Sequence, residues 1–129
     1  MRQLIIAAFV FPTFGMTAHS EGLHAVRSLP GYVCMQLALT PEENTDPTRG
    51  VPVRTLPSSS DVVSSWAPSV LVVPSPQQPT SGFLQVLLPN GHRGWIQAAA
   101  LKPWTNPYSP NRRCIPSVMS NGGIGYDFR

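Results

Sequence analysis

The chain has 129 residues, of which 15 are proline, 42% are hydrophobic and 12% are charged. So many prolines argue against long helices, and the hydrophobic fraction is too high for a disordered chain, so we expect one small folded domain. The net charge of +3 is slight and gives no clustered basic footprint, which argues against a nucleic-acid partner.

Residues 1–20 resemble a secretory signal peptide. Arg2 supplies a positive start, residues 4–16 form an apolar run, and Ala18-His19-Ser20 is a small-x-small cleavage site. We expect cleavage after Ser20. The run is too short to span a bilayer, and an uncleaved amphipathic anchor is the weaker alternative because the run has no polar face. The protein is therefore predicted to be periplasmic or secreted, with no membrane span after removal of the leader.

Export changes how the two cysteines are interpreted. Cys34 and Cys114 are the only cysteines, and an even count in an oxidising compartment predicts one disulfide. It would close a loop of about 80 residues, which corresponds to about 4.5 kcal/mol in the chain-entropy model. The alternative is a catalytic Cys34 thiolate with His92 as its base. Nothing near Cys34 in the sequence lowers a thiol pKa, so we favour the disulfide.

The first half of the domain reads as short strands joined by polar loops. Residues 21–30 form an irregular lead-in, and residues 31–39 alternate as a half-buried strand. Residues 40–50 form an acidic surface loop that lacks the spacing of a calcium-binding loop. Residues 51–69 begin with a short alternation and continue as a serine-rich loop. Residues 70–73 suit a buried strand, which the proline-rich connection over residues 74–81 ends.

Residues 82–97 form the clearest element, a β-hairpin. A two-residue turn at Asn90-Gly91 would place Ile96 on the outer face, whereas a three-residue loop over residues 89–91 pairs Leu84 with Ile96 and Val86 with Gly94. We therefore predict the three-residue loop, with Gly91 in the left-handed conformation. A single helical or 3-10 turn follows at residues 98–102, and residues 105–129 are predicted to be an irregular tail.

Two sequence blocks resemble the bacterial SH3 domain family, and the resemblance covers residues 31–104. The first block contains Val51, Val53, Arg54, Pro57, Ser58 and Ser60. The second contains Gly82, Phe83, Val86, Leu88, Pro89, Asn90, Gly91, Gly94, Trp95, Ile96, Leu101 and Lys102. The resemblance implies an all-β fold, a small five-stranded, partly open SH3-like barrel with a short 3-10 turn.

The departures from the family pattern concern the ligand groove. Phe83 stands where the family usually has Trp, and residues 40–50 are inserted beside the usual groove. Ala100 occupies a position where SH3-like domains commonly present a groove-lining Tyr. A groove for proline-rich peptides needs aromatic walls, so recognition of that kind is not expected.

Four apolar residues are candidates for ligand binding. In the predicted register Phe83, Leu87 and Trp95 share the outer face of the hairpin as an exposed stripe. The alternative is that residues 105–129, held by Cys114, fold back and cover the stripe. Trp66 in the serine-rich loop is the fourth candidate, with core packing as its alternative.

These features favour a binding module over an enzyme. The sequence contains no Ser-His-Asp set, no metal-spaced His/Cys group and no paired carboxylates near a helix, so neither a metal nor a cofactor is predicted. We expect an exported SH3-like module that recognises a cell-wall polymer, for example a peptidoglycan peptide. The alternative is a structural or interaction protein that docks to another periplasmic protein through the outer face of the hairpin.

Overall fold

A computed structural model describes residues 22–46, 48 and 50–129. The predicted signal peptide lies outside these residues. Within the described residues, none of the helices has the length and apolar character needed to cross a membrane.

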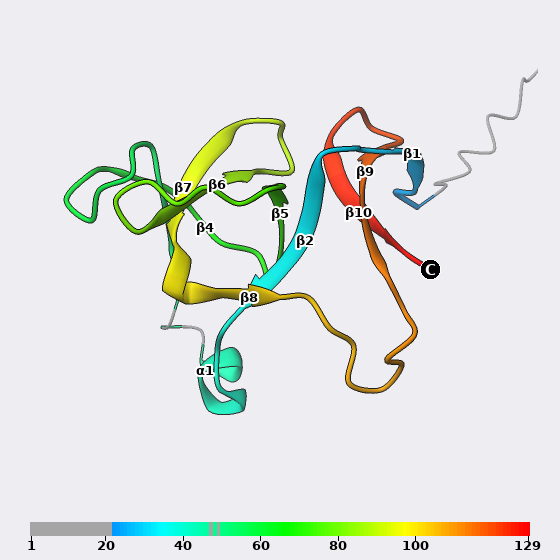
Figure 1. Ribbon diagram of the computed structural model, residues 1–129, viewed down its shortest axis with the longest axis horizontal. Helices are drawn as coiled ribbons and strands as arrows, with labels where there is room; N and C mark the ends of the chain where they lie inside the picture. The colour runs from blue at the N-terminus through cyan, green and yellow to red at the C-terminus, as the bar shows by residue number, and fades with distance from the viewer. Residues whose placement is uncertain (1–21, 47, 49) are drawn as a thin grey trace, which may run out of the picture.

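The described chain folds into two antiparallel sheets, so the all-β prediction is confirmed (Figure 1). The larger sheet has the order β4-β3-β7-β6-β5-β2-β8 and the smaller one β1-β9-β10. The ends of the larger order, β4 and β8, are not paired with each other in the described residues, so this sheet is not a closed barrel.

The strands of the larger sheet are β2 (Tyr32–Leu37), β3 (Pro52–Arg54), β4 (Val63–Trp66), β5 (Val70–Pro74), β6 (Phe83–Leu87), β7 (Arg93–Gln97) and β8 (Leu101–Pro103). Those of the smaller sheet are β1 (Ala25–Ser28), β9 (Cys114–Met119) and β10 (Ile124–Phe128). Two short helices complete the described chain, α1 (Pro41–Thr45) and the 3-10 helix η1 (Ala98–Ala100).

The core lies on one face of the larger sheet. Alternate residues of each strand point to this face, as the period of a β-strand requires. Together they form one cluster of buried side chains, made of Met35, Val53, Leu71, Val73, Leu84, Val86, Leu88, Ile96 and Leu101. Ala98 and Ala100 of η1 pack against the cluster, which fixes the turn between β7 and β8.

The register predicted for the β6-β7 hairpin is confirmed. Leu84 pairs with Ile96 and Val86 with Gly94. The Leu88 amide donates to the His92 carbonyl at 2.8 Å, and the Gly91 amide donates to the Leu88 carbonyl at 2.8 Å, so residues 89–91 form the loop. Gly91 has a φ of 83°, the left-handed conformation that a glycine adopts without steric cost.

Gly94 of β7 allows β3 to approach closely, because a Cβ atom there would lie 2.3 Å from Cγ1 of Val53. We expect Gly94→Ala to lower the free energy of unfolding by about 1–3 kcal/mol through overpacking. Urea denaturation would measure the loss. Gly22→Ala is the control, because nothing lies within 4 Å of that position. Equal unfolding midpoints for the two variants would contradict this packing.

Residues 40–50 are not wholly irregular, as the loop prediction had them, because α1 occupies part of this segment. The Thr40 hydroxyl accepts a hydrogen bond from the Glu43 amide at 3.2 Å, and the Glu43 carboxylate accepts one from the Thr40 amide at 3.4 Å. This capping box, followed by Pro41 at the first helical position, starts a helix of one turn.

The predictions of an irregular lead-in and an irregular C-terminal tail are wrong. Residues 25–28 and 114–128 form the smaller sheet, in which β9 pairs with both β1 and β10. The turn from β9 to β10 repeats the chemistry of the β6-β7 loop. The Met119 amide donates to the Gly123 carbonyl at 2.9 Å, and Gly122 has a φ of 81°. The sheet exists because its residues bury one another and pack against β2, although none of its strands has a continuous apolar pattern.

The predicted disulfide is present between Cys34 of β2 and Cys114 of β9, with a Cα–Cα distance of 6.0 Å. It joins the two sheets, which lie side by side at β2 and β9 (Figure 1). The pairing confirms the prediction that the C-terminal segment is tied to the strand that contains Cys34.

Removing this bond should destabilise the protein strongly. We expect Cys34→Ser combined with Cys114→Ser to lower the free energy of unfolding by about 4.5 kcal/mol, because the 80-residue separation no longer restricts the unfolded chain. Urea denaturation of both proteins would test this. The folded wild type should also weigh about two mass units less than its reduced form and resist thiol labelling, because two hydrogens are lost on oxidation. Labelling of both cysteines in the folded protein would contradict the disulfide.

Candidate functional site

The predicted outer stripe of the hairpin is not a continuous exposed surface. Phe83 is only 6% exposed, so its expected exposure is wrong. The Thr80 amide donates to the Phe83 carbonyl at 2.8 Å and the Phe83 amide donates to the Thr80 carbonyl at 2.9 Å. The preceding segment therefore folds back along the start of β6, which the alternation of residues within the strand could not indicate.

Leu87 lies under the smaller sheet. It shares a cavity of about 30 Å³ with Val72 of β5 and with Ile124 and Tyr126 of β10. Beside this cavity the Ile124 amide donates to the Pro89 carbonyl at 2.9 Å. The C-terminal segment thus lies over this part of the stripe, as the alternative expectation proposed, and leaves Leu87 half-buried.

Trp95 is half-buried at a separate place on the larger sheet. It pairs with Gln85 of β6 and lines a depression of about 240 Å³ together with Pro76, Gln77 and Thr80 of the connection between β5 and β6. Trp66 does not line this depression. The structure therefore does not bring the four sequence candidates together into one site.

Trp66, at the end of β4, is the candidate that the structure leaves accessible, with 64% of its surface exposed. A Cβ atom at Gly50 would lie 2.7 Å from Cε3 of the indole, so part of the ring rests against Gly50. Core packing of this Trp, the alternative expectation, is excluded by its exposure. The exposed indole offers a large amphipathic surface that can stack on a ligand.

A groove of about 290 Å³ runs from Trp66 to the tip of the β6-β7 hairpin and is lined by Ser65, Trp66, Pro68, Leu88, Pro89 and Asn90. The Ser65 hydroxyl oxygen is buried and has no hydrogen-bond partner among the described residues. Because this oxygen is closed off from solvent, Ser65 forms part of the wall of this Trp66 groove, and the exposed indole of Trp66 is the surface that a ligand can contact.

The backbone amide and carbonyl of Trp66 point away from the neighbouring strand β3. The Ala67 amide donates to the Val51 carbonyl at 2.8 Å, and successive residues of a strand direct their polar groups to opposite sides. The amide and carbonyl of Trp66 therefore point to the open edge of β4, the last strand of the larger sheet. An extended chain could form backbone hydrogen bonds there.

A second groove, of about 350 Å³, lies beside the disulfide and includes Tyr32, Trp104, Arg112 and Arg113. The sequence analysis did not identify this groove, which places aromatic rings beside the two arginines. The predicted disulfide could have indicated this groove, because Cys34 and Cys114 bring the two chain segments that line it together.

The loop between β3 and β4 contains one perturbed carboxyl group. The Thr55 hydroxyl donates to the Asp61 carboxylate, and this bond, with one from the Val62 backbone, holds the pKa of Asp61 below its usual range. The Arg54 guanidinium donates to the Asp61 carbonyl at 2.7 Å. These contacts close the loop that leads into β4 and so into Trp66. The pKa of Asp61 is lower in the folded than in the unfolded state, so the hydrogen bonds to its carboxylate stabilise the fold fully above the unfolded-state pKa. This stabilisation is lost as the pH falls through the folded-state pKa.

We expect Thr55→Val to raise the pKa of Asp61 toward that of an unperturbed aspartate, because the principal hydrogen bond to the carboxylate is lost. An NMR pH titration of the side-chain carboxyl carbons would measure the shift. Thr48→Val is the matched control, because the Thr48 hydroxyl donates to Asp46 at 2.6 Å and should affect the pKa of Asp46 alone. An unchanged Asp61 titration in the first variant would contradict the assigned bond.

Within the described residues, no group of three or more His, Cys, Asp or Glu side chains is placed to hold a metal ion. Comparisons with protein-family models, with curated proteins and with solved structures found no match.

Proposed function

We propose that this protein is an exported, non-enzymatic binding module with an SH3-like core that recognises a cell-envelope ligand such as a peptidoglycan peptide. The observation that carries the proposal is the Trp66 groove, where an exposed indole lies at the open edge of β4.

The strand order of the larger sheet supports the SH3-like assignment. Its segment β8-β2-β5-β6-β7 supplies the five strands that the family resemblance implies. In the sequence, β3 and β4 form a hairpin between β2 and β5, and η1 precedes β8. Ala100 packs against the core and supplies no aromatic wall, in line with the expectation that proline-rich peptides are not the ligand.

The disulfide supports an extracytoplasmic location. Structural disulfides persist mainly in oxidising compartments, and the sequence of residues 1–20 has the pattern of a leader. In the periplasm or outside the cell, wall polymers are the abundant ligands that a small binding module meets.

The chemistry of the Trp66 groove suits a short peptide attached to sugar. The backbone groups of Trp66 at the open edge of β4 can pair with an extended peptide, and the indole can stack on an apolar side chain or a sugar ring. A peptidoglycan stem peptide with its sugar offers both an extended backbone and a sugar ring.

Co-sedimentation with purified cell wall tests the proposal. The wild-type protein should pellet with the wall, and Trp66→Ala should reduce the bound fraction about tenfold or more, as expected for the loss of a central aromatic contact. Tyr108→Ala is the control, because this ring is 94% exposed and lies outside the Trp66 groove. No pelleting of the wild type, or an equal loss in both variants, would contradict the proposal.

A protein partner is the second candidate. Its docking site would be the edge of β4 rather than the outer face of the hairpin that the sequence suggested. The outer face of the hairpin is covered at Leu87 by β10, whereas the edge of β4 is open and its residues Val63-Ser64-Ser65-Trp66 carry no charge. Charged side chains commonly protect such edges. Failure to pellet with intact wall would favour this candidate, in which an extended segment of another periplasmic protein pairs with β4.

A further inference from the structure

The groove beside the disulfide is formed jointly by the two sheets. Tyr32 comes from β2, Trp104 follows β8, and Arg112 and Arg113 precede β9. The Cys34–Cys114 bond forms part of its wall. Since neither sheet alone contains the full set of side chains, this groove exists only when the two sheets are held together.

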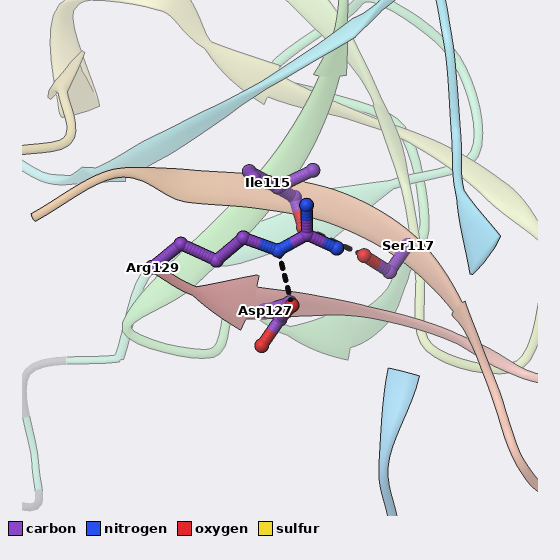
Figure 2. A network of polar contacts seen from close by, with 4 residues as sticks. All are labelled: Ile115, Ser117, Asp127 and Arg129. Atoms are coloured by element: carbon purple, nitrogen blue, oxygen red, sulfur yellow. Dashed lines mark hydrogen bonds and ion pairs between the residues drawn. The ribbon is translucent and has the colours of Figure 1, made fainter. Parts of the chain in front are cut away.

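Its two arginines have no acidic partner among the described residues. Asp127, which pairs with Ile115 across the β9–β10 ladder, is bonded to Arg129. The Arg129 Nε donates to Oδ2 of Asp127 at 2.9 Å (Figure 2). Asp127 also lies on the face of β10 opposite to Phe128, because adjacent residues of a strand alternate. Arg112 and Arg113 are exposed, and no described side chain bonds to either guanidinium. Two adjacent positive charges are therefore available to an anion.

The backbone that carries these arginines is held in place before any ligand arrives. The Arg113 amide donates to the Arg129 carbonyl at 2.7 Å, and the Arg129 amide donates to the Arg113 carbonyl at 3.0 Å. The Arg112 amide donates to the Ser109 carbonyl at 2.9 Å. Cys114, the next residue, is fixed by the disulfide. A ligand therefore needs to order only the arginine side chains, which lowers the entropic cost of binding.

The aromatic wall of the groove is fixed as well. The Trp104 indole stacks on Phe128 of β10, with ring centroids 5.1 Å apart and an interplanar angle of 20°. The Phe128 ring in turn packs against the Tyr126 ring, with centroids 5.0 Å apart. Contacts of this kind restrict the indole to one orientation, so that it presents an apolar surface beside the two cations.

We propose that this groove binds a carboxylate-bearing ligand, with the guanidinium groups of Arg112 and Arg113 holding the carboxylate and the apolar body of the ligand lying against Trp104. Guanidinium and carboxylate groups form paired, charge-assisted hydrogen bonds in a common plane. The site is separate from the Trp66 groove and does not depend on the function proposed there.

The lining favours a carboxylate over a phosphate. Apart from the arginines, the groove is lined by Tyr32, Val33, Trp104, Pro116 and the disulfide, which offer few hydrogen-bond donors. A phosphate group brings more oxygens and more charge than a carboxylate, and its oxygens would lose water here without gaining enough partners. A carboxylate attached to a small apolar body fits both parts of the groove.

NMR titration of the oxidised protein with matched acid and neutral ligands tests this proposal. One pair is acetyl-D-alanyl-D-alanine and its C-terminal amide, and the other is N-acetylmuramic acid and N-acetylglucosamine. We expect a bound acid to shift the indole N–H signal of Trp104 and its neutral analogue to leave that signal unchanged, whatever happens at Trp66, which lies outside this groove. Which of the two acids binds identifies the source of the carboxylate as a peptide terminus or a sugar substituent.

Two double variants with the same net charge provide the control. Arg112→Gln with Arg113→Gln should weaken acid binding about tenfold or more, because each lost charged hydrogen bond is worth about that factor. Arg27→Gln with Arg93→Gln removes two arginines that do not line the groove and should leave the affinity unchanged. The proposal is overturned if neither acid shifts the Trp104 signal, if the neutral analogues or inorganic phosphate shift it equally, or if both double variants behave alike.

Discussion

The Cys34–Cys114 bond is the interaction on which the arrangement of this molecule depends. The two sheets share no backbone ladder, since β9 pairs with β1 and β10 while β2 pairs with β5 and β8. Among the described residues, the backbone hydrogen bond from Ile124 to Pro89 also joins β10 to the larger sheet. Few residues of the smaller sheet are buried, so the covalent link contributes strongly to holding it against β2.

Pro89 connects β10 to the Trp66 groove. Its carbonyl accepts from Ile124, and a Cβ atom on Gly123 would lie 2.7 Å from the same oxygen. The other side of this residue lines the Trp66 groove. The tip of the β6-β7 hairpin is thus held by β10 on one side and faces the candidate ligand on the other, which gives the groove one rigid wall.

Local patterns predicted the larger sheet well and the smaller one poorly. The β6-β7 register followed from the burial of Ile96 and from the turn chemistry of residues 89–91, because both act between neighbours in sequence. Residues 121–122 repeat the same Asn-Gly pair, and that signal could have revealed the β9-β10 hairpin. It was missed because the flanking strands contain Pro116 and Gly125 and have no regular apolar alternation. The burial of Phe83 was missed because it involves the turn back to Thr80, which the alternation within β6 does not show. The groove beside Arg112 was not predictable in this way, since it arises from segments distant in sequence.

The pairing of β1 with β9 has a consequence for how the protein reaches its folded state. One strand lies near the start of the described chain and the other near its end, and the disulfide likewise joins residues 80 positions apart. Contacts of such long sequence separation form slowly, because most of the chain must be ordered before they close. A chain that crosses a membrane from its N-terminus therefore cannot complete the smaller sheet until β9 has emerged. The arginine-lined groove is then among the last features to form, because it needs both the smaller sheet and the disulfide.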